Sequence, residues 1–129
     1  MITKAIGDSS PTIGYRSINT DHATSVIGQD VMVSKEPEET EDRIWVLDAI
    51  QYSYKPSSGV TATAAPANGG IVVMLGDKVK WEADISDYTG KLDFYMPGQT
   101  DKKFTVTLKS GGQNFIGKLN VQWHLEPAQ

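Results

Sequence analysis

Four segments in the second half of the chain alternate between apolar and polar residues, and this period of two constrains the fold most. They are VKWEADI at residues 79–85, KLDFYM at 91–96, FTVTLK at 104–109 and FIGKLNVQWHL at 115–125. Alternate residues of a β-strand point to opposite faces, so each segment would have one apolar and one polar face. One wet face per strand is typical of antiparallel sheets, and the pattern predicts an all-β protein.

The stretch RIWVLDAIQYSY, residues 43–54, is open to two interpretations. Its β-branched and aromatic residues favour a strand. Helical spacing from Ile44 would collect a poor apolar stripe of Leu47, Asp48 and Gln51. We expect a long strand, buried on both faces where it begins, with Asp48 as the one polar residue of its apolar face. A helix with an acidic first turn is the alternative.

Turn-forming residues separate these runs, as a meandering sheet requires. GDK at residues 76–78 and SGGQN at 110–114 each fit the turn of a hairpin, and residues 55–70 fit a loop with one weak strand at 60–64. No helical pattern of ten or more residues is present. Seven or eight short strands predict an antiparallel β-sandwich with jelly-roll or Greek-key connections rather than a closed barrel.

The first part of the chain is less regular, so we expect an extended N-terminal arm and acidic hinge over residues 1–41 and the β-sandwich domain over residues 42–129. Its apolar runs are short, and residues 13–18 and 31–33 could each form a brief strand. A long segment of this kind is usually functional or disordered. We expect the arm to lie on a partner subunit, and the candidate partner-binding residues are Ile13, Tyr15, Arg16, Ile18, Val31 and Val33. The alternative is that the segment supplies edge strands to its own sandwich.

Composition narrows the classes of partner. Residues 35–42 hold one lysine and five acidic residues, which accounts for the whole net charge of −4. With no basic patch, nucleic acid is not an expected partner. The longest apolar run, IVVML at residues 71–75, is far shorter than the roughly 20 residues of a membrane span, so no membrane partner is expected. The N-terminus lacks the apolar core of a secretion signal.

Few residues suggest catalysis, and we expect no enzyme, no cofactor and no metal. The chain has no cysteine, and its only histidines, His22 and His124, are expected to be solvated. The tripeptide GDS at residues 7–9 matches the start of a hydrolase motif, but no strand–turn–helix pattern holds it, so a turn is the better interpretation. Glu82 and Asp84 share a strand face, as carboxylates on any polar face do.

A calcium site and a sugar platform are the remaining alternatives. Oxygen ligands from Asp84, Asp87 and Asp93 could surround a loop, although hairpins also use aspartate for turns. Sugar platforms need exposed aromatic residues. The tryptophans at 45, 81 and 123 fall on apolar faces and are expected in the core, which leaves Tyr88 and Tyr95 as surface aromatics.

The order of these segments resembles small β-rich virion proteins of tailed bacteriophages. The similarity covers residues 43–123 and is clearest in IWVLD at 44–48 and SGGQNFIGKLNV at 110–121. It implies a capsid decoration, or cement, protein that binds the major capsid protein and stabilises the phage head. It further implies a homodimer or homotrimer on the capsid surface of the virion, made in the host cytoplasm.

We therefore expect attachment to the capsid through residues 1–35 and one sheet face. The alternative is a receptor- or glycan-binding module of a phage tail or fibre, and a small hydrolase ranks third. A glycan module would keep its sugar affinity without the first 35 residues, whereas a decoration protein would lose capsid occupancy.

Overall fold

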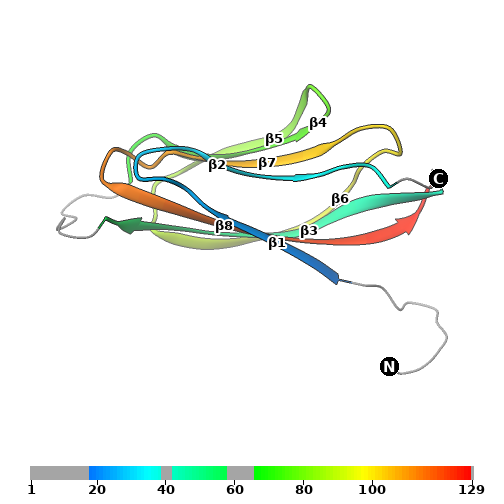
Figure 1. Ribbon diagram of the computed structural model, residues 1–129, viewed down its shortest axis with the longest axis horizontal. Coiled ribbons are helices and arrows are strands. Elements are labelled where there is room, and N and C mark those ends of the chain that lie inside the picture. The colour runs from blue at the N-terminus through cyan, green and yellow to red at the C-terminus, as the bar shows by residue number, and fades with distance from the viewer. Residues whose placement is uncertain (1–17, 39–41, 58–65, 129) are drawn as a thin grey trace.

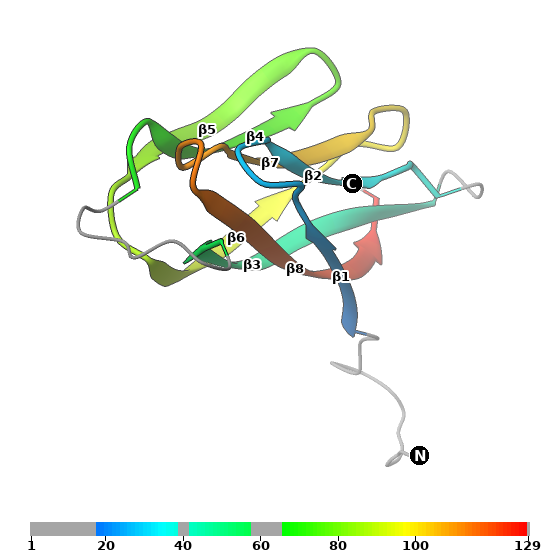
Figure 2. The same cartoon turned by 60° about the vertical axis from the view of Figure 1, so that its left-hand side comes forward.

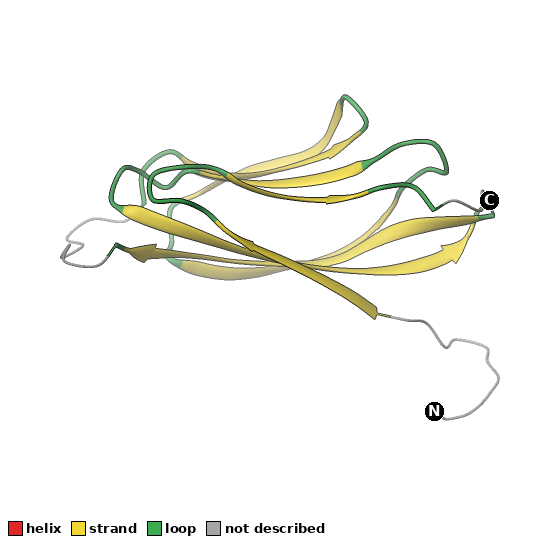
Figure 3. Ribbon diagram, in the orientation of Figure 1, coloured by secondary structure: helices red, strands yellow, loops and turns green. Residues whose placement is uncertain are grey.

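The computed structural model describes residues 18–38, 42–57 and 66–128 of the chain. These residues form strands joined by loops and turns, as Figure 3 shows. The strands are β1 (Ile18–Thr24), β2 (Val31–Lys35), β3 (Arg43–Pro56), β4 (Gly69–Leu75), β5 (Lys78–Ile85), β6 (Thr89–Pro97), β7 (Phe104–Lys109) and β8 (Phe115–Pro127). The described part of the chain includes no helix that could cross a membrane.

The strands form two antiparallel sheets that pack face to face as two layers (Figure 1). Sheet A has the order β1-β8-β3-β6, and sheet B has the order β2-β7-β4-β5. The pairs include β1 with β8, β2 with β7, β3 with β6 and β4 with β5, and β8 with β3 and β7 with β4 complete the two sheets. In this arrangement the first half of the chain pairs with the second half as in one long hairpin, and the hairpin folds into two sheets. The topology is a jelly roll. The predicted all-β antiparallel sandwich is confirmed.

The core lies between the sheets and consists of the apolar faces that the period-two pattern predicts. β7 contributes Phe104, Val106 and Leu108, and β8 contributes residues from Phe115 to Trp123 at every second position. Each such side chain contributes about 1.5–3 kcal/mol by leaving water. Trp123 is fully buried, whereas Trp45 and Trp81 are partly buried and pack against the core from its margins.

The midpoint of the rolled hairpin is the tight turn between β4 and β5. Gly76 has a φ of 62°, a left-handed conformation that costs glycine little and other residues more. The turn connects Leu75 at the end of β4 with Lys78 at the start of β5, and these two residues are paired in the sheet. The predicted hairpin at residues 76–78 is confirmed in this form.

β3 contains an irregularity that the sequence interpretation lacked. The register shifts between Leu47 and Ala49 against both neighbouring strands, which leaves Asp48 in a β-bulge. A bulge inserts one extra residue and reverses which side chains face the core. Leu47 belongs to the core before the bulge, and Ile50 belongs to it afterwards. The strand is buried on both faces where it begins, as expected, but the expectation that one apolar face continues through Asp48 was wrong.

The expected boundary at residue 41 does not match the sheets. β1 pairs with β8 along its full length, and β2 pairs with β7, so both strands belong to the sandwich (Figure 2). Lys35 of β2 also reaches across the layers to Asp21 of β1, with 2.9 Å between Nζ and Oδ2. For residues 18–35 the structure shows the edge-strand alternative rather than an extended arm. Residues 1–17 and the proposed weak strand at 60–64 lie outside the described residues.

Candidate functional site

The outer face of sheet A carries a groove that crosses all four of its strands. Twelve residues line it, and its cavity volume is about 610 Å³, which lies within the usual ~300–1,000 Å³ of ligand sites. The outward side chains form two rows in register from β1 through β8 and β3 to β6: His22, Asn120, Gln51 and Lys91 in one, and Thr24, Lys118, Ser53 and Thr89 in the other.

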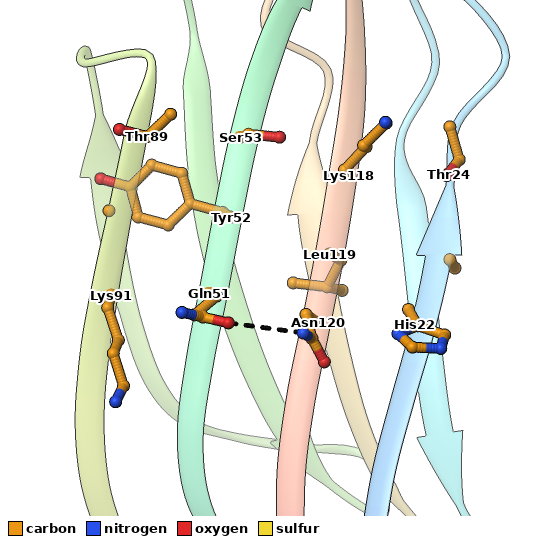
Figure 4. Close-up of a pocket in the computed structure, with 12 residues that line it drawn as sticks. His22, Thr24, Gln51, Tyr52, Ser53, Thr89, Lys91, Lys118, Leu119 and Asn120 are labelled. Carbon is orange, nitrogen blue, oxygen red and sulfur yellow. Dashed lines mark hydrogen bonds between the residues drawn. The ribbon is translucent and has the colours of Figure 1, made fainter.

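These rows are polar and close enough to interact. Figure 4 shows Gln51 and Asn120 side by side at the centre of the groove, with Lys91 beyond Gln51 and His22 beyond Asn120. The amide Nδ2 of Asn120 donates to Oε1 of Gln51 at 3.4 Å, near the long limit of a hydrogen bond. Asn120 Oδ1 has no hydrogen-bond partner among the described residues. That oxygen is itself buried, so the weak Gln51–Asn120 bond is the feature that the centre of the groove offers to a ligand.

The groove is also basic, although the chain as a whole is acidic. Its lining includes Lys91, Lys118 and His22, and no lining residue is an aspartate or glutamate. Lys91 also lies 3.8 Å from Asp93, a pair exposed to solvent. Such exposed pairs contribute little because water screens them. A chain with a net charge of −4 thus carries a local positive region on this face.

Tyr52 supports the floor of the groove from the core side. It is paired with Gly90 of β6, and a side chain at that glycine would collide with the tyrosine ring. The phenol donates to Oδ1 of Asp87 at 3.0 Å. Burial, and then the hydrogen bond and negative charge of Asp87, raise the pKa of Tyr52 to about 12. Tyr52 is therefore a neutral, fixed structural residue rather than a proton carrier at neutral pH.

Tyr54 connects the two sheets near the same end. Its hydroxyl donates to the carbonyl oxygen of Lys109 at 2.6 Å and accepts from the amide of Gly70 at 3.2 Å. Burial raises the pKa of Tyr54, the Gly70 hydrogen bond opposes that rise, and the charge of Asp30 adds to it. Because β3 belongs to sheet A and both partners belong to sheet B, this hydroxyl fixes the spacing of the layers.

His124 is fully buried, so the expectation that it is solvated was wrong. Its Nδ1 lies 2.7 Å from both carboxylate oxygens of Asp48, and its Nε2 lies 2.6 Å from Oε2 of Glu126. The Tyr95 hydroxyl donates to the other Glu126 oxygen at 2.5 Å. Each ring nitrogen is therefore within hydrogen-bond distance of a carboxylate. A ring enclosed in this way acts as a structural link between β3 and β8.

The predicted partner-binding residues have different positions. Val31 and Val33 are buried in the core, so contact with a partner through these side chains does not fit the structure. Their outward neighbour on β2, Met32, is 58% exposed. Ile18 begins β1 opposite His124. Ile13, Tyr15 and Arg16 lie outside the described residues.

The carboxylates considered for calcium do not come together as a metal site. Among the described residues, no group of three or more His, Cys, Asp or Glu side chains could hold a metal ion. Asp87 instead binds the Tyr52 hydroxyl, and Asp93 lies beside Lys91 on the surface. Asp84 lines a small hollow with Glu82 on the outer face of sheet B. The GDS tripeptide at residues 7–9 lies outside the described part of the chain.

Comparison with known proteins gives distant structural likenesses alone. No protein-family model matches the chain, and no curated protein matches it by sequence. Among solved structures, FlhE is 13% identical with a TM-score of 0.39, over 84% of this chain and 96% of FlhE. A family two carbohydrate esterase from Cellvibrio japonicus is 13% identical with a TM-score of 0.36, over 89% of this chain and 36% of the esterase. Likenesses this weak identify no binding partner or activity for this chain.

The groove was not predicted because its residues are scattered along the sequence. His22, Gln51, Lys91 and Asn120 come from four different strands and meet through register alone. The available signal was the outward polar set of each strand, especially Gln51 and Ser53 after the apolar start of β3. The outward polar residues of each strand predict that sheet A has a polar outer face. They do not predict that this face forms a groove.

Proposed function

We propose that the chain is a structural protein of a tailed-bacteriophage virion, a decoration protein that binds the major capsid protein and stabilises the head. The resemblance at residues 44–48 and 110–121 supports this proposal. The jelly roll supports it as an analogy, because viral capsid and lectin domains commonly use this architecture. Fold alone does not define function, so the proposal depends on where the protein could adhere.

The observation that carries the proposal is a set of exposed apolar side chains between the start of the β1–β2 connection and the middle of β2. Val26 is 72% exposed, Ile27 is 43% exposed and Met32 is 58% exposed. Val26 and Ile27 lie in the connection, and Met32 lies on the outer face of sheet B. All three fall within residues 1–35, the part of the sequence expected to attach to the capsid. Their closeness in sequence makes this segment the candidate adhesive edge of the protein.

In this proposal the rigid sandwich attaches to the shell through the exposed side chains of Val26, Ile27 and Met32. Each apolar side chain buried against the shell would contribute about 1.5–3 kcal/mol. Self-association as a dimer or trimer would multiply a modest contact, because linked copies bind at a high effective concentration. Decoration of this kind requires no reaction, and the protein would reside on the capsid surface.

The test is binding to expanded, DNA-free shells assembled from the major capsid protein of the same phage genome. Bound chains per shell are counted after sedimentation of shells mixed with the wild-type protein or with the triple variant Val26→Ser, Ile27→Ser, Met32→Ser. The wild type should reach saturation, and the variant should bind at least about tenfold more weakly because three apolar contacts are lost.

The matched control is Val79→Ser on β5, which removes a side chain that is 52% exposed outside this segment. It should bind as the wild type does. Circular dichroism verifies that every variant is folded, as expected for exposed positions. Shells that bind no wild-type protein, or that bind the triple variant equally well, would overturn the proposal.

A further inference from the structure

We infer that the groove on the outer face of sheet A binds an acidic oligosaccharide, a chain of sugar rings that carry carboxylate or sulfate groups. The inference does not depend on the capsid proposal. The groove lies on sheet A, whereas Met32 lies on the opposite outer face, that of sheet B. Attachment through β2 would leave the groove pointing away from the shell.

The neutral side chains of the groove match the hydroxyl groups of a sugar. Hydroxyls on Thr24, Ser53 and Thr89 donate and accept, and the amides of Gln51 and Asn120 offer both functions in one plane. The Gln51–Asn120 bond is long at 3.4 Å, so the two amides are only weakly bonded to each other. A ligand hydroxyl that replaces this long bond therefore breaks no strong contact.

The charges of the groove select an acidic ligand. Lys118 on β8 and Lys91 on β6 are separated by one intervening strand, β3. Two strand spacings of about 4.8 Å and an offset of two residues along the strands place their backbones about 12 Å apart. Two cations at this separation, with neutral hydrogen-bonding groups between them, suit a ligand whose negative charges repeat along a polar chain. No acidic lining residue opposes such a ligand.

The same surface is poorly suited to nucleic acid, the other common polyanion. Proteins that bind single strands stack bases on exposed aromatic rings. In this groove Tyr52 is buried and its ring packs against the backbone at Gly90, so it offers no stacking platform. The net charge of −4 also opposes a phosphate backbone outside the groove.

Binding is tested on the full chain by amide NMR titration at low salt. The acidic probes are a galacturonate hexasaccharide and a heparin-derived hexasaccharide, and the comparison probes are neutral cellohexaose, inorganic sulfate and a single-stranded oligonucleotide. At least one acidic hexasaccharide should bind at millimolar concentration or tighter, with shifted amides confined to β1, β8, β3 and β6. No response to either acidic probe would overturn the inference, and so would equal binding of any comparison probe.

Two double variants separate the groove from general charge. Lys91→Gln with Lys118→Gln removes both groove cations, and Lys78→Gln with Lys80→Gln removes two exposed lysines of β5 outside the groove. The first pair should weaken hexasaccharide binding by about tenfold or more, as expected when charge-assisted contacts are lost. The control pair should change it less than about twofold, because distant charges are screened. Equal losses in the two variants would show non-specific attraction and contradict a built site.

Discussion

The Nδ1 atom of His124 lies 2.7 Å from each carboxylate oxygen of Asp48, and the residues come from adjacent strands of sheet A. Asp48 occupies the β-bulge of β3, so the bulge turns its carboxylate toward a ring that is fully buried. Glu126 holds the other ring nitrogen at 2.6 Å. The irregularity in β3 and the burial of His124 therefore form one structural feature.

Replacing His124 with glutamine should destabilise the protein strongly. The histidine ring contacts Asp48 through Nδ1 and Glu126 through Nε2. The glutamine side chain cannot span both carboxylates in this way, so at least one of these contacts is lost. Losing the hydrogen bonds of a buried polar side chain typically costs about 1–3 kcal/mol. Urea unfolding followed by tryptophan fluorescence measures this loss.

His22→Gln is the matched control, because His22 is exposed on β1 in the same sheet. A change within about 0.5 kcal/mol is expected there. If the two substitutions cost the same, His124 is not the link that its contacts indicate.

Tyr54→Phe should loosen the contact between the sheets. The substitution keeps the ring but removes the hydroxyl that binds Lys109 and Gly70. We expect a loss of about 1–3 kcal/mol, the usual cost of leaving buried backbone groups unsatisfied. Thr107→Val, which removes a hydroxyl from the outer face of sheet B, should cost less than about 0.5 kcal/mol. A loss from Tyr54→Phe no greater than this would contradict the inter-sheet role.

Stability should fall in alkaline solution because of Tyr52. Its pKa is about 12 in the folded protein against 10.0 for an ordinary tyrosine. A raised pKa means that folding favours the neutral phenol, so the contribution is complete below pH 10 and is lost as pH rises toward 12. Unfolding free energies measured across this range should decline less steeply in Tyr52→Phe. An identical decline in both proteins would show that Tyr52 is not responsible.

Gly90→Ala should destabilise the junction of β3 and β6. The added methyl group would overlap the ring of Tyr52, which crosses the glycine from the neighbouring strand. Overpacking of this kind costs about 1–3 kcal/mol. Thermal unfolding compares it with Thr89→Ala, an exposed neighbour on the same strand that should be nearly neutral. A neutral Gly90→Ala would show that the ring can move aside.

The strands that the sequence predicts best are those with an uninterrupted alternation. FTVTLK matches β7 residue for residue, and FIGKLNVQWHL matches β8 except for two further residues at its end. The alternation works because one face of each strand is buried and the other is not. For these strands the local pattern and the tertiary environment agree.

β1 is a strand that the local sequence pattern does not predict. Its sequence INTDHAT has few apolar residues, and the strand forms because β8 supplies a full set of backbone partners. Edge strands of this kind are determined by pairing with a distant segment, which no local pattern records. The same holds for the bulge at Asp48, which reversed the faces of β3, and for the rows that form the groove.

Cryo-electron microscopy of expanded shells incubated with the protein tests the functional proposal most directly. We predict ordered density for the two-sheet sandwich on the shell, with Val26, Ile27 and Met32 against the major capsid protein and the sheet A groove facing solvent. Bare shells, or a sandwich attached through the groove of sheet A, would contradict it.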